Sequence, residues 1–188
     1  MKTVLNHVAL LLPSAERASE ILRPLGAKMN PAAQWEGEGT LEIYVGDLDS
    51  QMASLLLMEP IQEGAYSHAM KKRGPGLHHL AIDVLHMEDF LDSIASSGWL
   101  LHPRSVKMIR QSKTAYLARP GIPTLIEVQE REELKTHRPL VEEIRIPHLQ
   151  AKELQMFQTL GLSQILASAT PELELTLAGN KVAFSSLL

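Results

Sequence analysis

The sequence predicts an α+β fold built from a repeated β-α-β-β unit, with room for one further short strand in each copy. An apolar run with one histidine leads into a helical pattern and then a glycine. This arrangement occurs twice with the same spacing of nineteen residues, from His7 to Gly26 and from His79 to Gly98. Strand-like runs follow each copy, and a partial third βαββ unit that lacks the histidine comes last.

The first unit opens with an apolar strand that only His7 interrupts. Ser14 is placed to cap a helix whose apolar residues recur at helical spacing until Pro24 and Gly26 end it. The expected elements are a strand at 5–12, a helix at 14–25, a short strand within 29–35, and strands at 40–45 and 52–58.

The second unit repeats this order after a Gly74-Pro75-Gly76 turn. Its apolar strand carries His79, and its helix has an apolar stripe that Gly98 ends. The expected elements are a strand at 77–84, a helix at 87–97, a short strand within 100–109, and strands at 114–118 and 124–129.

The third unit is predicted as a strand at 141–146, a helix that ends at Gly161, and a hairpin of 173–177 with 181–188. Glu142 lies nineteen residues before Gly161, where the other copies have histidine. The unit stops near the point where its own ligand strand would finish, so we expect no metal ligand from it. We expect it to cover a sheet edge or to build a dimer contact. The predicted division is a first module at 1–66, a second at 74–132, a linker at 133–140 and the partial module at 141–188.

Composition narrows the class of protein. The 188 residues carry a net charge of −4, which argues against a nucleic-acid partner. No apolar run approaches the ~20 residues that a membrane span needs, and no signal-peptide pattern is present, so we expect a cytoplasmic protein. The absence of cysteine excludes disulfides, cysteine–zinc sites and cysteine nucleophiles. Any metal must therefore be held by His, Asp or Glu.

The repeat itself suggests a site. Equivalent strands of two packed copies would bring His7 and His79 together, and Glu127 lies within an apolar strand near the end of the second unit. A buried carboxylate without a partner is costly, so Glu127 needs a cation or a solvated cavity. Two histidines and a carboxylate form a metal-binding face suited to Fe, Mn, Co, Ni or Zn. The equivalent position in the first unit is Leu55 or Leu56; Glu59 is near but reaches the site only if its strand bulges.

The doublet His78-His79 poses a second question. Neighbouring side chains of a regular strand point to opposite faces, so we expect only one of the two histidines to face the site. The residues alone leave open which one it is.

Several segments resemble the vicinal-oxygen-chelate superfamily, which includes glyoxalase I, methylmalonyl-CoA epimerase and ring-cleaving dioxygenases, and the epimerase and glyoxalase-like branch is the most similar. The segments that carry the resemblance are 6–10 (NHVAL), 58–60 (MEP), 72–84 (KRGPGLHHLAIDV), 114–117 (TAYL) and 125–128 (LIEV), within roughly the first 130 residues. It implies paired βαβββ modules that form a curved mixed sheet, with helices outside, around a divalent metal. It also implies the ligands His7, His79 and Glu127, with His78 on the outer face of the sheet. The fourth family ligand falls at Leu56, which leaves three.

The resemblance implies a metal-dependent lyase or isomerase of glyoxalase or methylmalonyl-CoA epimerase type, in which the metal chelates two neighbouring oxygens and stabilises an enolate. Glu127 would be a ligand and a base, and a second base would come from Glu36 or Glu38, of which we select Glu38. One alternative is an Fe(II) ring-cleaving dioxygenase with the His-His-Glu site. Another is a non-catalytic small-molecule-binding protein with a degraded metal site. In each case we expect a small-molecule partner, anionic if Lys71, Lys72 and Arg73 steer it, and a homodimer.

Overall fold

The computed structural model describes residues 2–103, 105–135, 137–147 and 149–188. The first unit contains β1 (Thr3–Leu11), α1 (Ala15–Leu22), a 3-10 turn (Arg23–Leu25), β2 (Ala33–Trp35), β3 (Thr40–Val45), β4 (Gln51–Met52) and β5 (Ser54–Pro60). Helix α2 (Ala65–Arg73) follows. The second unit contains β6 (Gly76–Val84), α3 (Met87–Ile94), β7 (Leu100–Leu101), α4 (Ser105–Ser112), β8 (Thr114–Arg119) and β9 (Ile122–Glu130). The last part contains β10 (Arg138–Pro139), β11 (Val141–Ile146), α5 (Ala151–Thr159), β12 (Ile165–Ala167), β13 (Glu174–Leu177), β14 (Asn180–Ala183) and a 3-10 turn (Phe184–Leu187).

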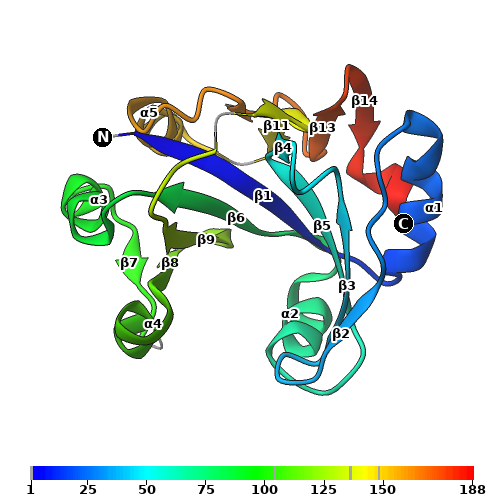
Figure 1. Ribbon diagram of the computed structural model, residues 1–188, viewed down its shortest axis with the longest axis horizontal. Helices are drawn as coiled ribbons and strands as arrows, with labels where there is room; N and C mark the ends of the chain where they lie inside the picture. Colours follow the sequence, from blue (N-terminus) through cyan, green and yellow to red (C-terminus); the bar gives the residue numbers. More distant parts are fainter. Residues whose placement is uncertain (1, 104, 136, 148) are drawn as a thin grey trace.

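The first two units form one eight-stranded mixed sheet with the order β2-β3-β5-β1-β6-β9-β8-β7. Strands β1 and β6 pair antiparallel at its centre, while β5 runs parallel to β1 and β9 runs parallel to β6. The sheet arches, and its concave side opens toward α2 and α4 (Figure 1). The predicted fold class, with paired modules in a curved mixed sheet, is confirmed.

The two faces of the large sheet have different partners because the side chains of β1 alternate. Val8 and Leu10 belong to the main apolar core, which also includes apolar residues of α1, α3 and the last unit. Ala9 and Leu11 belong to a smaller cluster on the other face, against which Tyr66 and Met70 of α2 pack. The convex face is therefore the main core, and the concave face is left for a site.

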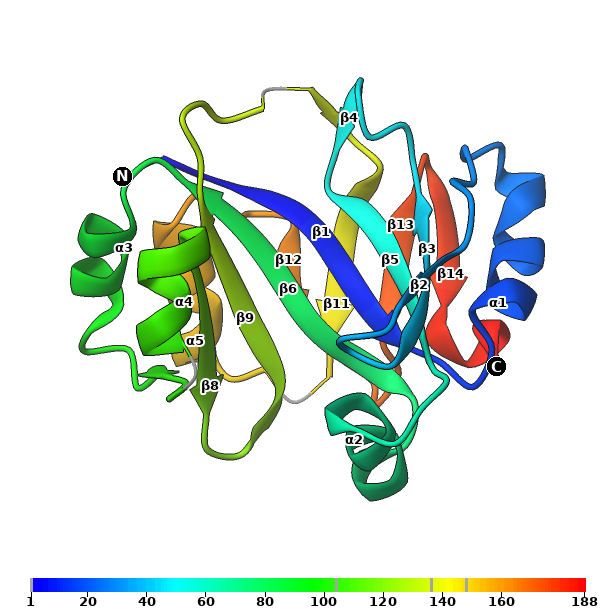
Figure 2. The ribbon, with the colours of Figure 1, turned by 60° about the horizontal axis from the view of Figure 1, so that its bottom comes forward.

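The last unit forms a second sheet with the order β12-β11-β13-β14, which lies behind β1 and β6 in Figure 2. Its apolar residues join the same core as the convex face of the large sheet. The expectation that this unit covers a sheet edge is wrong, because it covers a face. It also contains β12, a strand that the sequence did not indicate. The first strand of this unit, β11, lies between β12 and β13, whereas β1, the first strand of the first unit, lies beside β5, the last strand of that unit.

Two predicted strands differ in detail. The strand expected within 100–109 is only the two residues of β7, and α4 follows it. The Ser105 hydroxyl joins the start of α4 to β8, because it accepts a hydrogen bond from the Tyr116 amide and donates one to the Tyr116 carbonyl. The strand expected at 52–58 is divided into β4 and β5 at Ala53, whose φ of 50° lies in the left-handed region. Within the described residues, no helix has both the length and the apolar character to cross a membrane.

A buried ion pair joins the second unit to the last one. Arg119 Nη2 lies 2.6 Å from Glu153 Oε1, and the Glu153 side chain is 2% exposed. Removing one partner of a buried pair leaves a buried charge without compensation. We predict that Arg119→Met lowers the free energy of unfolding by about 3 kcal/mol, as measured by urea denaturation.

The matched control is Arg138→Met, which removes an ion pair with Glu142 that is largely exposed on the arginine side. We expect that variant to lose no more than about 1 kcal/mol. Equal losses in the two variants would contradict the structural role of Arg119.

Candidate metal centre

Three strands bring the predicted ligands together on the concave face. His7 lies on β1, His79 on β6 and Glu127 on β9, and all three side chains are buried. His7 Nε2 lies 3.1 Å from His79 Nε2, and His79 Nε2 lies 3.3 Å from Glu127 Oε2. One ligand atom from each residue lies within 4.8 Å of the others. The pairing of β1 with β6 and of β6 with β9 fixes this arrangement.

The spacing of these atoms fits a small divalent cation. Nitrogen and oxygen ligands bind such ions at about 2.0–2.2 Å. Two ligands at about 2.1 Å, separated by a right or tetrahedral angle, lie about 3.0–3.4 Å apart. The separations between His7 Nε2 and His79 Nε2 and between His79 Nε2 and Glu127 Oε2 fall in this range. The donor set of two imidazoles and a carboxylate also suits borderline divalent metals.

Burial leaves the two histidines neutral, as ligands must be. Burial, with a smaller contribution from the positive charge of Arg131, lowers the pKa of His7 to about 4. Burial and the neighbouring histidines hold the pKa of His79 well below its usual value. Burial raises the pKa of Glu127, while hydrogen bonds from Gln129 and Tyr116 lower it. A cation between these three groups would compensate the buried carboxylate.

A β-bulge corrects the prediction for the histidine doublet. The pairing of β1 with β6 steps from Ala9–His79 to Leu10–Leu77, so His78 is an extra residue in β6. Its ring centroid lies only 5.2 Å from that of His79, and the two Nδ1 atoms are 2.9 Å apart. His78 is buried against His79 and Tyr66 of α2, and it also borders a second cavity beside the last unit, so its side chain is not simply turned away from His79 as predicted. The rule of alternating side chains failed because the strand is irregular at this residue.

Side-chain contacts form a closed ring that passes through the three candidate ligands. Gln129 donates to Glu127 Oε1 at 2.5 Å, and Arg131 donates to Gln129 and, through Nε at 3.2 Å, to Asp83. Asn6 Nδ2 donates to the other Asp83 oxygen at 2.7 Å, and Asn6 Oδ1 lies 2.8 Å from His7 Nδ1. The ring fixes the orientation of the groups that face the site, as supporting residues do in metal proteins.

The position that corresponds to Glu127 in the first unit is Leu56. Leu56 pairs with Ala9 and Tyr44, as Glu127 pairs with Ala81 and Tyr116 in the second unit. This register selects Leu56 over Leu55, and the Leu56 side chain lines the site.

Glu59 does not join the site. One of its carboxylate oxygens accepts a hydrogen bond from the amide of Ala15, the first residue of α1. Glu130 does the same for Met87, the first residue of α3. Both carboxylates therefore stabilise helix N-termini, and the described residues leave three candidate ligands at this site.

A cavity of about 220 Å³ lies next to the three candidate ligands. Of the two predicted bases, Glu38 lines it and Glu36 does not. The Tyr66 hydroxyl of α2 donates to Glu38 Oε2 at 2.8 Å. The other lining residues, which the sequence did not indicate, are Trp35, Glu42, Tyr44, Met58, Tyr66, Tyr116 and Gln129.

Two of these missed residues carried a signal in the sequence. His7 and His79 are 72 residues apart, and Tyr44 and Tyr116 have the same separation. Each tyrosine ring contacts the histidine of its own unit edge-on, with centroids 5.6 Å and 6.4 Å apart. Extending the repeat beyond the helix would have identified both tyrosines.

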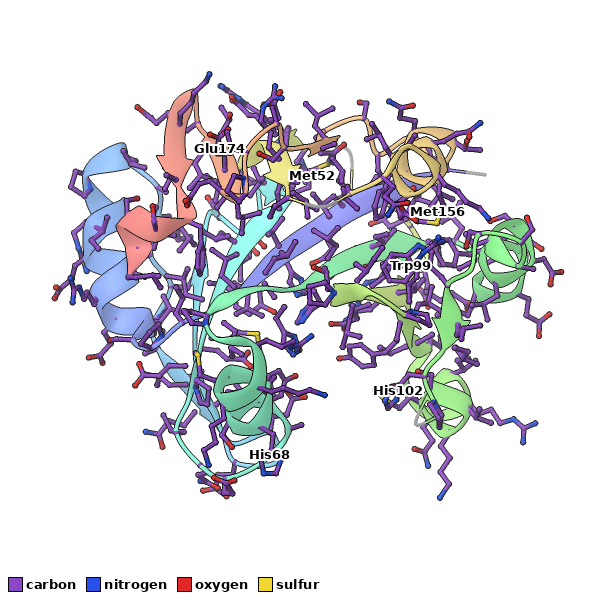
Figure 3. All side chains as sticks on the ribbon, turned by 180° about the vertical axis from the view of Figure 1, so that it is seen from behind. Met52, His68, Trp99, His102, Met156 and Glu174 are labelled. Carbon is purple, nitrogen blue, oxygen red and sulfur yellow. The ribbon has the colours of Figure 1, made fainter. Side chains whose placement is uncertain are left out.

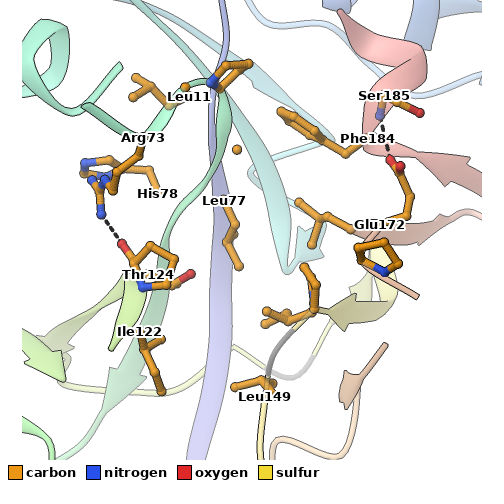
Figure 4. Close-up of a pocket in the computed structure, with 18 of the residues that line it drawn as sticks. Leu11, Arg73, Leu77, His78, Ile122, Thr124, Leu149, Glu172, Phe184 and Ser185 are labelled. Carbon is orange, nitrogen blue, oxygen red and sulfur yellow. Dashed lines mark hydrogen bonds between the residues drawn. The ribbon is translucent and has the colours of Figure 1, made fainter. Parts of the chain in front are cut away.

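A larger cavity of about 520 Å³ lies elsewhere, between the large sheet and the last unit. Leu11, Leu77, Leu149 and Phe184 surround it, with Arg73 and His78 at one side (Figure 4). None of the three candidate ligands lines it. It is therefore separate from the candidate metal centre.

Comparison with solved structures supports the fold. A hypothetical protein from Bacillus halodurans aligns with a TM-score of 0.56 at 21% identity, over 73% of this chain and 100% of its own. Methylmalonyl-CoA epimerase from Mycobacterium tuberculosis aligns with a TM-score of 0.51 at 22% identity, over 67% and 86% of the two chains. The Streptomyces coelicolor epimerase in complex with 2-nitronate-propionyl-CoA aligns with a TM-score of 0.52 at 21% identity, over 72% and 100%.

At these identities the alignments show the fold alone, which this chain shares with the methylmalonyl-CoA epimerases. No protein-family model and no curated protein matches the sequence.

The ring of contacts predicts a measurable loss of stability. Arg131→Met removes the cation that contacts the buried Asp83 carboxylate and the donor that orients Gln129. Because hydrogen bonds to charged groups contribute about 1.5–3 kcal/mol, we expect a loss of about 2 kcal/mol in the free energy of unfolding. Urea denaturation measures it.

The control is Arg17→Met on the exposed side of α1, which we expect to change stability by about 0.5 kcal/mol or less. An Arg131→Met protein as stable as this control would contradict the account of the ring.

Proposed function

We propose that this protein is a metal-dependent isomerase or lyase of epimerase or glyoxalase type, with His7, His79 and Glu127 as its metal ligands. The observation that carries the proposal is the spacing of three buried ligand atoms beside a small cavity. The fold shared with methylmalonyl-CoA epimerases agrees with it. A divalent cation held there would supply Lewis-acid stabilisation of negative charge on neighbouring substrate oxygens.

Side chains of the protein supply the remaining roles, which are to hold the metal and to accept the substrate proton. Both oxygens of Glu127 have partners, since Oε1 accepts from Gln129 and Oε2 faces His79. We therefore assign Glu127 as a ligand and no longer as a base. Glu38 is exposed to solvent at the cavity, and the Tyr66 hydroxyl orients its carboxylate. Glu38 accepts the proton that leaves the substrate carbon next to a carbonyl group, and in a glyoxalase-type isomerisation it returns this proton to the neighbouring carbon. Inversion at the same carbon requires that a second acid protonates the enolate from the opposite face.

The substrate class follows from the size of the cavity and from the fold relatives. A volume of about 220 Å³ accommodates a small acyl group and not a whole coenzyme. Two fold relatives were solved with methylmalonyl-CoA and with 2-nitronate-propionyl-CoA. We propose a small branched or dicarboxylic acyl group as the reacting part, presented as a thioester. The homodimer and the cytoplasmic location stay predictions.

A second candidate function rests on Leu56. Because this position supplies no ligand, two histidines and one carboxylate remain, which is the ligand set of non-haem Fe(II) oxygenases with open positions. Aerobic turnover of catechols by the Fe(II)-loaded protein would favour a ring-cleaving dioxygenase over the isomerase. Tight binding of a small molecule without any turnover would favour the non-catalytic binding protein.

Metal content tests the ligand set. We expect the wild-type protein, after incubation with Zn(II) or Co(II) and desalting, to retain about one metal ion per chain by elemental analysis. His79→Ala should retain less than about a tenth of this amount, because only two ligands remain. The control is His68→Ala, since His68 is an exposed residue on the far side of α2 (Figure 3). A wild-type protein that retains no metal would refute the proposed metal site.

Proton exchange tests the base. Glu38→Gln should slow the exchange of the substrate α-proton with deuterated water by at least about a hundredfold, because a positioned base contributes about 10²–10⁴-fold. The probe is methylmalonyl-CoA, with the exchange followed by mass spectrometry.

The matched control is Glu36→Gln, two residues away and outside the cavity, with an expected change below about twofold. If both variants exchange at the wild-type rate, Glu38 is not the base. If the wild-type protein does not exchange this proton, an epimerase for this thioester is excluded.

A further inference from the structure

The central strands carry two bulges that correspond to each other in the repeat. In β1 the pairing steps from Leu5–Ile82 to His7–Ala81, so Asn6 is an extra residue, as His78 is in β6. Asn6 and His78 are 72 residues apart, the same separation as between His7 and His79. Each bulge places the side chain of the preceding residue against the Nδ1 atom of a candidate ligand. The site therefore has two arms of the same construction, the pair Asn6–His7 and the pair His78–His79.

On the first arm the hydrogen-bond partners fix the state of His7. The Asp83 carboxylate is an acceptor only, so the amide group of Asn6 that lies 2.7 Å from it must be the NH₂ group. The Asn6 carbonyl oxygen then faces His7 Nδ1 at 2.8 Å, and this nitrogen must carry the proton and donate it. His7 Nε2 is left with a free lone pair, which points toward His79. Asp83 thus orients the Asn6 amide, and through it keeps the proton of His7 on Nδ1 and away from the ligand atom Nε2.

On the second arm an imidazole takes the place of the amide. The two Nδ1 atoms of His78 and His79 are 2.9 Å apart, so one donates and the other accepts. His79 can offer an Nε2 lone pair only if its own proton lies on Nδ1. His78 must then accept at Nδ1 and carry its proton on Nε2. The buried ring of His78 is held beside the ring of Tyr66, with centroids 4.8 Å apart.

We propose that Asn6 and His78 are a matched pair of positioning residues, which accept from His7 and His79 at Nδ1 and so direct both Nε2 lone pairs into one metal site. The inference rests on the proposed metal-binding function and goes beyond it, because it assigns a role to two residues that are not ligands. It also explains why two neighbouring histidines occur on β6, where only one can be a ligand.

The repeat supplies the variants for a test. His78→Leu removes the acceptor while it keeps an apolar side chain of similar bulk. His78→Asn instead copies the amide that the first arm uses. Asn6→Leu removes the acceptor on the other arm. His68→Leu, at an exposed histidine of α2, is the control.

Zinc affinity, measured by competition with a chromogenic chelator, is the first readout. We expect His78→Leu and Asn6→Leu to bind Zn(II) about 10–100-fold more weakly than wild type, as is usual when a group that orients a metal ligand is lost. His78→Asn should recover to within about threefold, and His68→Leu should bind as wild type does. Circular dichroism and thermal melting identify any variant that fails to fold. Folded His78→Leu protein with wild-type affinity, or His78→Asn as weak as His78→Leu, would overturn the proposal.

The protonation of the imidazole rings is the second readout, and it needs no variant that must fold. Long-range ¹H–¹⁵N spectra of the zinc-loaded wild-type protein should show His7 and His79 with their protons on Nδ1. A proton on Nε2 of either ring would overturn the proposal.

Metal-free protein separates this proposal from the proposed function. If the wild-type protein binds no zinc, the proposed function fails, and the spectrum of metal-free protein still decides the role of Asn6. His7 should then carry its proton on Nδ1 in wild type and lose this preference in Asn6→Leu. An unchanged His7 spectrum in Asn6→Leu would overturn the role of Asn6.

Discussion

The antiparallel pairing of β1 with β6 is the constraint on which the site depends. These strands lie at the centre of an eight-stranded sheet, where their backbone groups are paired on both sides. The pairing places His7 and His79 in adjacent strands on the concave face. On the outer side of each strand lies a parallel partner, β5 beside β1 and β9 beside β6. Two single-residue bulges in this pairing add Asn6 and His78 beside the histidines. In a regular strand pair, both side chains would point to the face opposite the neighbouring histidine.

The last unit makes the convex face of the large sheet a closed core. Its second sheet shares one apolar cluster with α1, α3 and the large sheet, and the buried Arg119–Glu153 pair connects it to the second unit. The main apolar core lies on the convex side, and the buried His7, His79 and Glu127 lie on the concave side, next to the smaller cavity. The main core and the candidate metal centre thus lie on opposite faces of the large sheet.

Much of the fold could be predicted from the sequence because each copy of the repeat contains an apolar run, a helical pattern and a glycine at the same spacing. The spacing from His7 to Gly26 and from His79 to Gly98 joins a strand, a helix and a stop, and it identified the two histidines that meet. The bulges could not be predicted, since a bulge arises from the match between two strands and leaves no mark on one of them. The ring through Asp83, Gln129 and Arg131 was also missed, because its members come from separate strand ends and meet only in the folded sheet.

We propose that one divalent cation binds between two imidazole nitrogens and one carboxylate oxygen of this protein. An anomalous difference map from crystals of the Co(II)-loaded protein, collected at the cobalt edge, tests this claim most directly. We expect one strong peak per chain, within about 2.0–2.2 Å of His7 Nε2, His79 Nε2 and a Glu127 carboxylate oxygen. A map without a peak at these three atoms, or with its only peak elsewhere on the protein, would contradict it.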